Sequence, residues 1–207
     1  ARRILVGEAG RRVQGFLAKL GIERSYVMIN TYVYSVYGSA GSKYVVDPAI
    51  AGYRNRWLDA LLVGTKVEAV VALGVLAEEA WTCWKATGPG LSVNLPFVKI
   101  THPTQPESGS KGDKQKLQAL TRKMLENWNQ ALQTLKPEIV HPDTSTGLTP
   151  YGATFLDAEH PLIPDGDLPA GLPTWMREYD GWARRVGTND EKKRANITIT
   201  VPKACRP

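Results

Sequence analysis

The chain has 207 residues, a net charge of +6 and an apolar content that is ordinary for a globular protein. No apolar run reaches the length of a membrane span, and no signal peptide is visible. Its two cysteines are too few for a disulfide framework or a four-cysteine metal or iron–sulfur site, which fits a reducing, cytoplasmic setting. The positive charge favours anionic partners, nucleic acid first.

Helices and strands are expected to alternate through the first two thirds of the chain. Apolar residues at helical spacing predict helices over Val13–Leu20, Ala49–Leu62, Val75–Trp84 and Lys114–Leu135. Near-continuous apolar runs predict buried strands over Ser25–Asn30, Val67–Gly74 and Phe97–Ile100. The alternation favours a three-layer α/β/α fold with a mainly parallel central sheet.

The connections differ in character. Residues 31–48 form a long tyrosine-rich segment that either covers the edge of the core or presents rings for stacking on bases. Residues 107–113 are rich in Gly, Ser and Lys and predict a linker. We therefore expect one α/β domain over residues 1–140 and a Pro/Gly-rich extension over 141–207, packed on that domain or trailing from it.

Within the extension, residues 141–173 show no sustained period and predict an ordered but irregular segment. Residues 175–186 predict a short helix. Residues 197–201 alternate and predict either an edge strand or a disordered tail.

Two polar residues follow predicted strands at their carboxyl ends, Asn30 and His102. In an open α/β sheet, ligands bind in the crevice beyond these ends. An amide such as Asn30 donates and accepts at once and can read the edge of a base. The alternative for both residues is an ordinary polar turn position.

The loop after His102 contains two prolines, Pro103 and Pro106, which stiffen it so that it can enter a partner at little entropic cost. Basic residues cluster just behind this loop, at Lys111, Lys114, Lys116, Arg122 and Lys123. These residues either bind a phosphate backbone or form a solvated helix face, and the sequence favours neither interpretation.

Other candidates carry weaker signals. The loop of residues 7–11 leads into a helix N-terminus. It could bind an anion there, or its small residues could allow close packing. Cys83 lies inside a predicted helix and is interpreted as a packed thiol rather than a nucleophile. His141 and His160 each precede a proline as His102 does, but neither follows a strand in the same way, so both are set aside.

Four segments, in this order, resemble motifs of the uracil-DNA glycosylase superfamily in its bacterial and archaeal branches: residues 2–11, 27–30, 67–80 and 101–104. They resemble the Arg-Pro-Phe-Val-Gly-x-Ala-Gly-Arg segment, the strand that ends in the uracil-recognising asparagine, the Val-x-Ala-Leu-Gly strand and helix, and the His-Pro-Ser loop. The resemblance covers residues 2 to 135.

The resemblance implies a repair enzyme that flips uracil out of DNA and hydrolyses its N-glycosidic bond, leaving free uracil and an abasic site. Asn30 would bond the Watson–Crick edge of uracil, and His102 would stabilise the charge that develops on its O2 atom. Pro103, Thr104 and Gln105, with Lys111 and Lys114, would contact DNA, and Gln105 would fill the space the base vacates.

Leu5 stands where the family has the phenylalanine that stacks on the flipped base, and the resemblance also implies that Gly7 binds the substrate. The family's first motif carries the acid that aligns the attacking water, and it is expected to lie before Ala1. The water-activating residue is therefore not identifiable, and the pattern does not give that role to the nearby Glu8. The four cysteines of the iron–sulfur branches are absent, so no metal or other cofactor is expected.

Three hypotheses follow. The first is a monomeric, cytoplasmic uracil-DNA glycosylase of base excision repair, acting at the bacterial nucleoid on single- or double-stranded DNA. The second is a non-catalytic protein that recognises uracil or abasic DNA on the same fold. The third is a flavodoxin-like nucleotide-binding domain, which would not need Asn30 and His102 together. The first is favoured.

Overall fold

The computed structural model describes residues 8–32 and 44–161, with short pieces of the remaining chain at 183–184, 188–189, 192, 198–199 and 203–205. The chain divides into two compact units, and the larger spans Gly7–Leu162. None of the described helices is both long enough and apolar enough to cross a membrane.

The sheet of the larger unit, as far as it is described, consists of two parallel strands, β1 (Val70–Leu73) and β2 (Phe97–Ile100). Val70 pairs with Phe97 and Leu73 with Ile100. Both strands lie inside predicted ones, and the prediction of a mixed α/β fold with parallel pairing is confirmed. Two strands are too few to establish a three-layer α/β/α arrangement, which stays a prediction.

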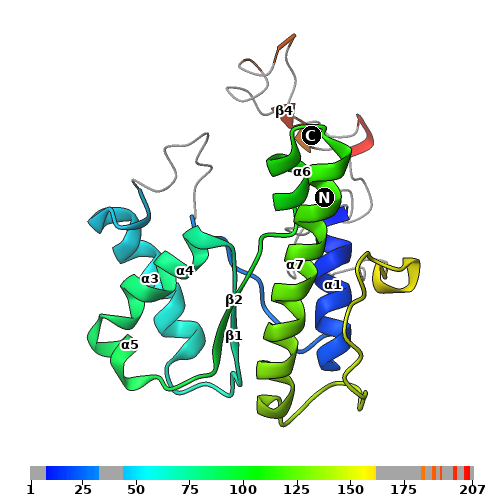
Figure 1. The fold of residues 1–207 in the computed structure, drawn as a ribbon. Helices are drawn as coiled ribbons and strands as arrows, with labels where there is room; N and C mark the ends of the chain where they lie inside the picture. The colour runs from blue at the N-terminus through cyan, green and yellow to red at the C-terminus, as the bar shows by residue number, and fades with distance from the viewer. Residues whose placement is uncertain are drawn as a thin grey trace. The chain divides into compact units, whose positions relative to one another are not determined.

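Helices lie on both sides of β1 and β2 (Figure 1). One side carries α3 (Pro48–Leu62), α4 (Val75–Lys85) and the short α5 (Gly88–Ser92). The other carries α1 (Glu8–Leu20) and α7 (Lys114–Leu135), with α6 (Gln105–Ser110) joining β2 to α7. Two 3₁₀ turns follow, η2 (Lys136–Glu138) and η3 (Asp157–Glu159). The four helices predicted within this unit are confirmed, and α7 has the predicted bounds.

Local signals set several helix starts. Asp47 caps α3 by accepting hydrogen bonds from the backbone amides of Ala49 and Ile50, and Pro48 occupies the first turn, where no amide is needed. Asp113 caps α7 through the amide of Lys116. Each cap satisfies amides that have no partner within the helix.

The side chains on the two faces of the strands belong to two different apolar clusters. Ile100 and its neighbours on one face pack with Phe16 of α1 and Trp128 of α7. Phe97 on the other face stacks on Trp81 of α4, with ring centroids 5.0 Å apart. Side chains of helices therefore pack on both faces of β1 and β2, the strands whose carboxyl ends lead toward His102.

The predicted strand over Ser25–Asn30 is wrong. These residues adopt no regular structure, and the side chains of Val27 and Ile29 are 61% and 42% exposed. Among the described residues no strand pairs with them. The backbone amides of residues 23–25 instead bond the carboxylate of Asp143, which lowers the pKa of that carboxyl below its ordinary range. An apolar run predicts a strand only where a partner strand exists.

The linker predicted over residues 107–113 is also wrong in part, because α6 occupies residues 105–110. Pro106 lies in its first turn and is buried, and Gly109 lets the helix approach α7, since a Cβ there would lie 2.9 Å from Cδ1 of Leu120. Lys111 then ends α6 in the left-handed conformation, with φ of 51°. The Gly/Ser composition reflects close packing here rather than flexibility.

Residues 141–161 pack on α1. The Lys19 ammonium lies 2.7 Å from the Glu159 carboxylate and 4.3 Å from the centre of the Tyr151 ring. The amide of Thr144 donates to the carbonyl of Gly21, and Tyr151 is buried in the same apolar cluster as Trp128. This first part of the predicted extension thus contributes side chains to the core of the larger unit.

In the smaller unit, β3 (Ala183–Arg184) pairs antiparallel with β4 (Thr198–Ile199), and a 3₁₀ turn spans Lys203–Cys205. The strand alternative for residues 197–201 is confirmed where they are described. The helix predicted over 175–186 is wrong at residues 183–184, and its other residues lie outside the described part. Most of the tyrosine-rich segment, residues 33–43, also lies outside it.

Candidate functional site

His102 lies at the carboxyl end of β2, where the sequence placed it. Its side chain rests against Gly74, the residue that ends β1, and a Cβ on Gly74 would lie 3.3 Å from that of His102. Gly74 has φ of +89°, a conformation that residues with a Cβ rarely adopt. Gly74 therefore both turns the chain into α4 and leaves room for the imidazole at the edge of the sheet.

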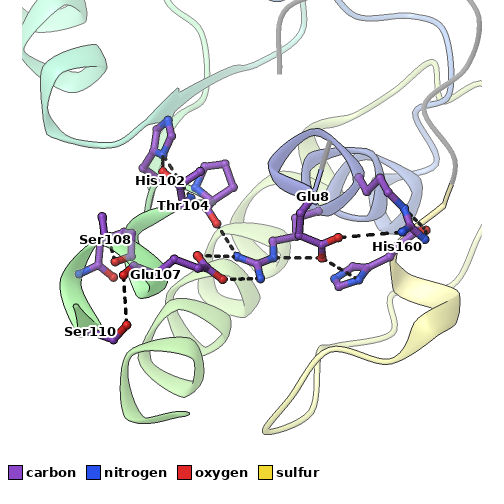
Figure 2. Close-up of polar contacts among 11 residues, drawn as sticks. Glu8, His102, Thr104, Glu107, Ser108, Ser110 and His160 are labelled. Atoms are coloured by element: carbon purple, nitrogen blue, oxygen red, sulfur yellow. Dashed lines mark hydrogen bonds and ion pairs between the residues drawn. The ribbon is translucent and has the colours of Figure 1, made fainter. Parts of the chain in front are cut away.

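The hydrogen bonds of His102 define its tautomer. The backbone amide of Thr104 donates to Nδ1 at 3.3 Å, and the Thr104 hydroxyl lies 2.8 Å from the same atom (Figure 2). A backbone N–H group can only donate, so this contact favours the tautomer in which Nδ1 accepts and the proton of the neutral ring is on Nε2. Burial lowers the pKa of His102, so the ring is neutral at physiological pH. Nε2 has no partner among the described residues.

The loop that carries His102 is held from several sides. The backbone of Thr101 bonds α7 twice, donating to Asn127 at 2.7 Å and accepting from the Trp128 indole at 2.9 Å. The side chains of Pro103 and Pro106 are fully buried. The burial of Pro103 contradicts its prediction as a DNA contact, because a fully buried side chain has no surface to offer DNA, and the stiffness of the loop stays a prediction.

A buried arginine of α1 also binds this loop. Arg12 donates from Nη1 to the carbonyl oxygen of Pro103 at 2.6 Å, and from Nη1 and Nη2 to the carboxylate of Glu107 at 3.1 and 2.7 Å (Figure 2). Burial by itself raises the pKa of Glu107, but the bonds and charge of Arg12 bring it below its ordinary value. Glu107 is therefore ionised, and the pair joins α1 to the first turn of α6.

Glu8 and His160, which the sequence analysis set aside, lie on the far side of Arg12. A carboxylate oxygen of Glu8 lies 3.0 Å from Nδ1 of His160 and 3.5 Å from Nε of Arg12. The ring of His102 points away from this pair (Figure 2). The ion pair of Glu8 with Arg12 could have been predicted, because residues four apart on a helix are neighbours. No local pattern in the sequence indicates that His160 joins this pair.

The structure does not bring the remaining predicted site residues together around His102. Asn30 is exposed and no described contact joins it to His102. Burial raises the pKa of the nearby Tyr32, and the charges of Arg54 and Glu79 act on it in opposite directions.

The predicted DNA-contacting residues occupy the corner between the His102 loop and α7. Thr104 is exposed and bonds His102, and Lys111 and Lys114 are exposed at the end of α6 and the start of α7. The Gln105 side chain lies over Gly109, with Nε2 3.2 Å from the position of a Cβ there, so it does not project as a wedge. Leu5 and Gly7 lie outside the described residues.

No three His, Cys, Asp or Glu side chains gather as a metal site would need within the described ranges. A comparison with protein-family models finds no match for the chain, and a comparison with curated proteins finds none either. The chemistry of the His102 loop is therefore the basis for a functional conclusion.

Proposed function

We propose that the chain is a uracil-DNA glycosylase, a hydrolase that removes uracil from DNA by cleaving its N-glycosidic bond. The observation that carries the proposal is the neutral imidazole of His102, held at the carboxyl edge of the sheet with Nε2–H unpaired among the described residues. Such a donor, fixed in advance, stabilises negative charge that develops in a transition state. The three-layer fold of the superfamily is part of the same proposal.

In the proposed reaction the bond between the sugar and N1 of uracil lengthens, and the departing base gathers negative charge on O2. His102 donates to that oxygen from Nε2 without becoming charged itself, because Nδ1 is already occupied by the amide of Thr104. The flipped base would lie beyond the carboxyl ends of β1 and β2, and Asn30 would select it. A water molecule attacks the anomeric carbon of the sugar, so that a C–O bond replaces the broken C–N bond, and the proton that the water loses ends on the departing uracil anion.

DNA would reach this edge along the corner of α6 and α7. Five cations with exposed side chains lie there, at Lys111, Lys114, Lys116, Arg122 and Lys123. No ion pair with a described acid is formed by any of them, so their charge is available to phosphates. Phosphate contacts of this kind position the duplex or strand, and base contacts then select the target.

A second candidate function is recognition of uracil-containing DNA without turnover. It is favoured by the position of Glu8, the acid that lies near the site in the sequence. Glu8 forms ion pairs with Arg11, Arg12 and His160, on the side of Arg12 away from His102. Among the described residues no carboxylate contacts His102. An enzyme needs a group that orients water, whereas a recognition protein does not.

The two functions are separated by incubating the protein with a labelled single-stranded oligonucleotide that contains one uracil, followed by alkaline cleavage. We expect a strand break at the uracil and none in matched oligonucleotides with cytosine or thymine. Retention of the uracil strand without a break would favour the recognition protein. Neither a break nor retention would contradict both functions.

The second expectation concerns Asn30. An amide donates to O4 of uracil and accepts from its N3–H, whereas Asn30→Asp offers only acceptors and would instead suit the amino group of cytosine. We expect the preference for uracil over cytosine to fall by about tenfold or more, since a good bidentate pair discriminates by about 1–3 kcal/mol. Excision of both bases is measured under single-turnover conditions.

Asn94→Asp is the matched control, because Asn94 is also an exposed asparagine but precedes β2 at the opposite end of the sheet. It introduces the same charge and should leave the preference unchanged. An unaltered preference in Asn30→Asp would remove Asn30 from uracil recognition.

A further inference from the structure

Arg12 is placed to hold the His102 loop in shape. Its side chain is only 11% exposed, although arginine is rarely buried, and all three of its hydrogen bonds go to residues of the loop and α6. One acceptor is the carbonyl of Pro103, the residue directly after His102. The other is the carboxylate of Glu107, in the first turn of the helix that follows.

The planar guanidinium suits this arrangement. It presents several donors in a fixed fork, so a single group spans both the carbonyl on one side of the turn and the carboxylate on the other. An ammonium at the same place would carry the same charge but would not fix two acceptors at a set separation. The geometry of the turn between His102 and Glu107 thus depends on an arginine that lies about ninety residues earlier in the chain.

Residues 155–160 support Arg12 from behind. The Phe155 ring lies under its guanidinium, with 5.0 Å from the ring centre to Cζ, and packs on the ring of His160 at 4.6 Å. Nδ1 of His160 in turn lies 3.0 Å from the Glu8 carboxylate, which also lies 3.5 Å from Nε of Arg12. The side chain of Arg12 is therefore enclosed by α1, the loop and this segment.

We propose that Arg12 is a positioning residue for His102, and that the segment of residues 155–160 acts in the function by keeping Arg12 in place. Arg12 does not contact the substrate. It keeps the amide of Thr104 directed at Nδ1 of His102, and so keeps the proton of the imidazole on Nε2. The catalytic part of this inference rests on the proposed function, while the link from Arg12 to the tautomer of His102 does not.

The link is tested by nitrogen-15 NMR of the imidazoles, whose shifts report which ring nitrogen carries the proton. The chain has three histidines, and the His102→Ala spectrum identifies the resonances of His102. In Arg12→Met we expect His102 to change from one fixed tautomer to a mixture, and its titration midpoint to rise toward the ordinary value as the loop becomes hydrated. Arg12→Lys retains the charge and should show a smaller change in the same direction, and it serves if Arg12→Met does not fold.

Lys136→Met is the matched control, since it removes another half-buried cation that donates to a backbone carbonyl, that of Leu20 at the end of α1, but contacts neither the loop nor residues 155–160. The resonances of His102 should be unchanged in this variant. A fixed tautomer and unshifted midpoint for His102 in both Arg12 variants would overturn the proposal. Equal shifts in Lys136→Met and Arg12→Lys would also overturn it, because they would indicate a general effect of losing a buried cation.

Kinetics provide the second readout. We expect kcat for uracil excision to fall about 10²-fold in Arg12→Met with little change in KM, as for a misplaced catalytic group, and Arg12→Lys to recover part of the loss. A wild-type kcat in Arg12→Met would overturn the proposal. If the wild-type protein excises nothing while the NMR changes occur, the proposed function fails and the positioning role of Arg12 stands.

Discussion

Replacing His102 with alanine is expected to slow uracil excision by about 10²- to 10³-fold, which corresponds to about 3 kcal/mol of lost transition-state stabilisation. The loss arises because the Nε2–H donor is fixed before the reaction by the bond from Thr104 to Nδ1 and by the packed loop. Water that replaces the ring must reorganise as charge develops on the base. The change is measured as the single-turnover rate on a uracil-containing oligonucleotide.

His141→Ala is the control, because His141 is exposed and bonds Glu68 away from the loop. Its rate should equal that of the wild type. The pH dependence gives an independent check. Since burial lowers the pKa of His102, the wild-type rate should hold through the ordinary histidine pKa of about 6.5 and fall only at lower pH, where the ring gains a proton at Nδ1. An unchanged rate in His102→Ala would remove this residue from the mechanism.

The parts of the fold that the sequence predicted are those with local causes. The 22 residues of α7 carry a sustained apolar stripe and a capping aspartate, so both its type and its bounds were predictable. The strand of residues 97–100 was bounded by prolines. His102 was found by the same reasoning, since a polar residue directly after a buried strand must lie at the edge of the sheet.

The parts that were missed depend on partners far away in the sequence. Arg11 bonds the carbonyl of His160 across 149 positions, and no local pattern marks either residue for the other. The segment 25–30 has the composition of a strand, but its start is held instead by Asp143, which accepts from the backbone amides of residues 23–25. The short helix α6 was not predicted because its glycine and serines are typical of a linker. The close contact of Gly109 with Leu120 of α7, which explains the glycine, cannot be read from the local sequence.

These distant contacts give the first part of the predicted extension a structural role. By composition, residues 141–161 differ from the α/β part of the chain, and the sequence assigned them no role. In the structure they contribute Tyr151 to the core and Phe155 to the surroundings of Arg12. The loop of His102 is thus supported from one side by α7 and from the other by Arg12, which itself depends on residues from the end of the unit.

At the contact between α1 and η3, Gly15 leaves no room for a side chain, so we expect its substitution to have a large effect on stability. A Cβ on this residue would lie 2.0 Å from the carbonyl oxygen of Glu159, a distance that requires the backbone of η3 to move. Alanine is favoured over glycine within a helix by about 1 kcal/mol. We nevertheless expect Gly15→Ala to lower the free energy of unfolding by about 1–3 kcal/mol net, as overpacking does. Urea denaturation measures the change.

Gly52→Ala provides the comparison that separates helix propensity from crowding. Gly52 is an exposed residue of α3, and a Cβ there would have no atom within 4 Å. This substitution should therefore stabilise the protein by about 0.4–1 kcal/mol, opposite in sign to the effect of Gly15→Ala. If both variants were stabilised alike, the close approach of η3 to α1 would be contradicted, and with it the support that residues 155–160 give to Arg12.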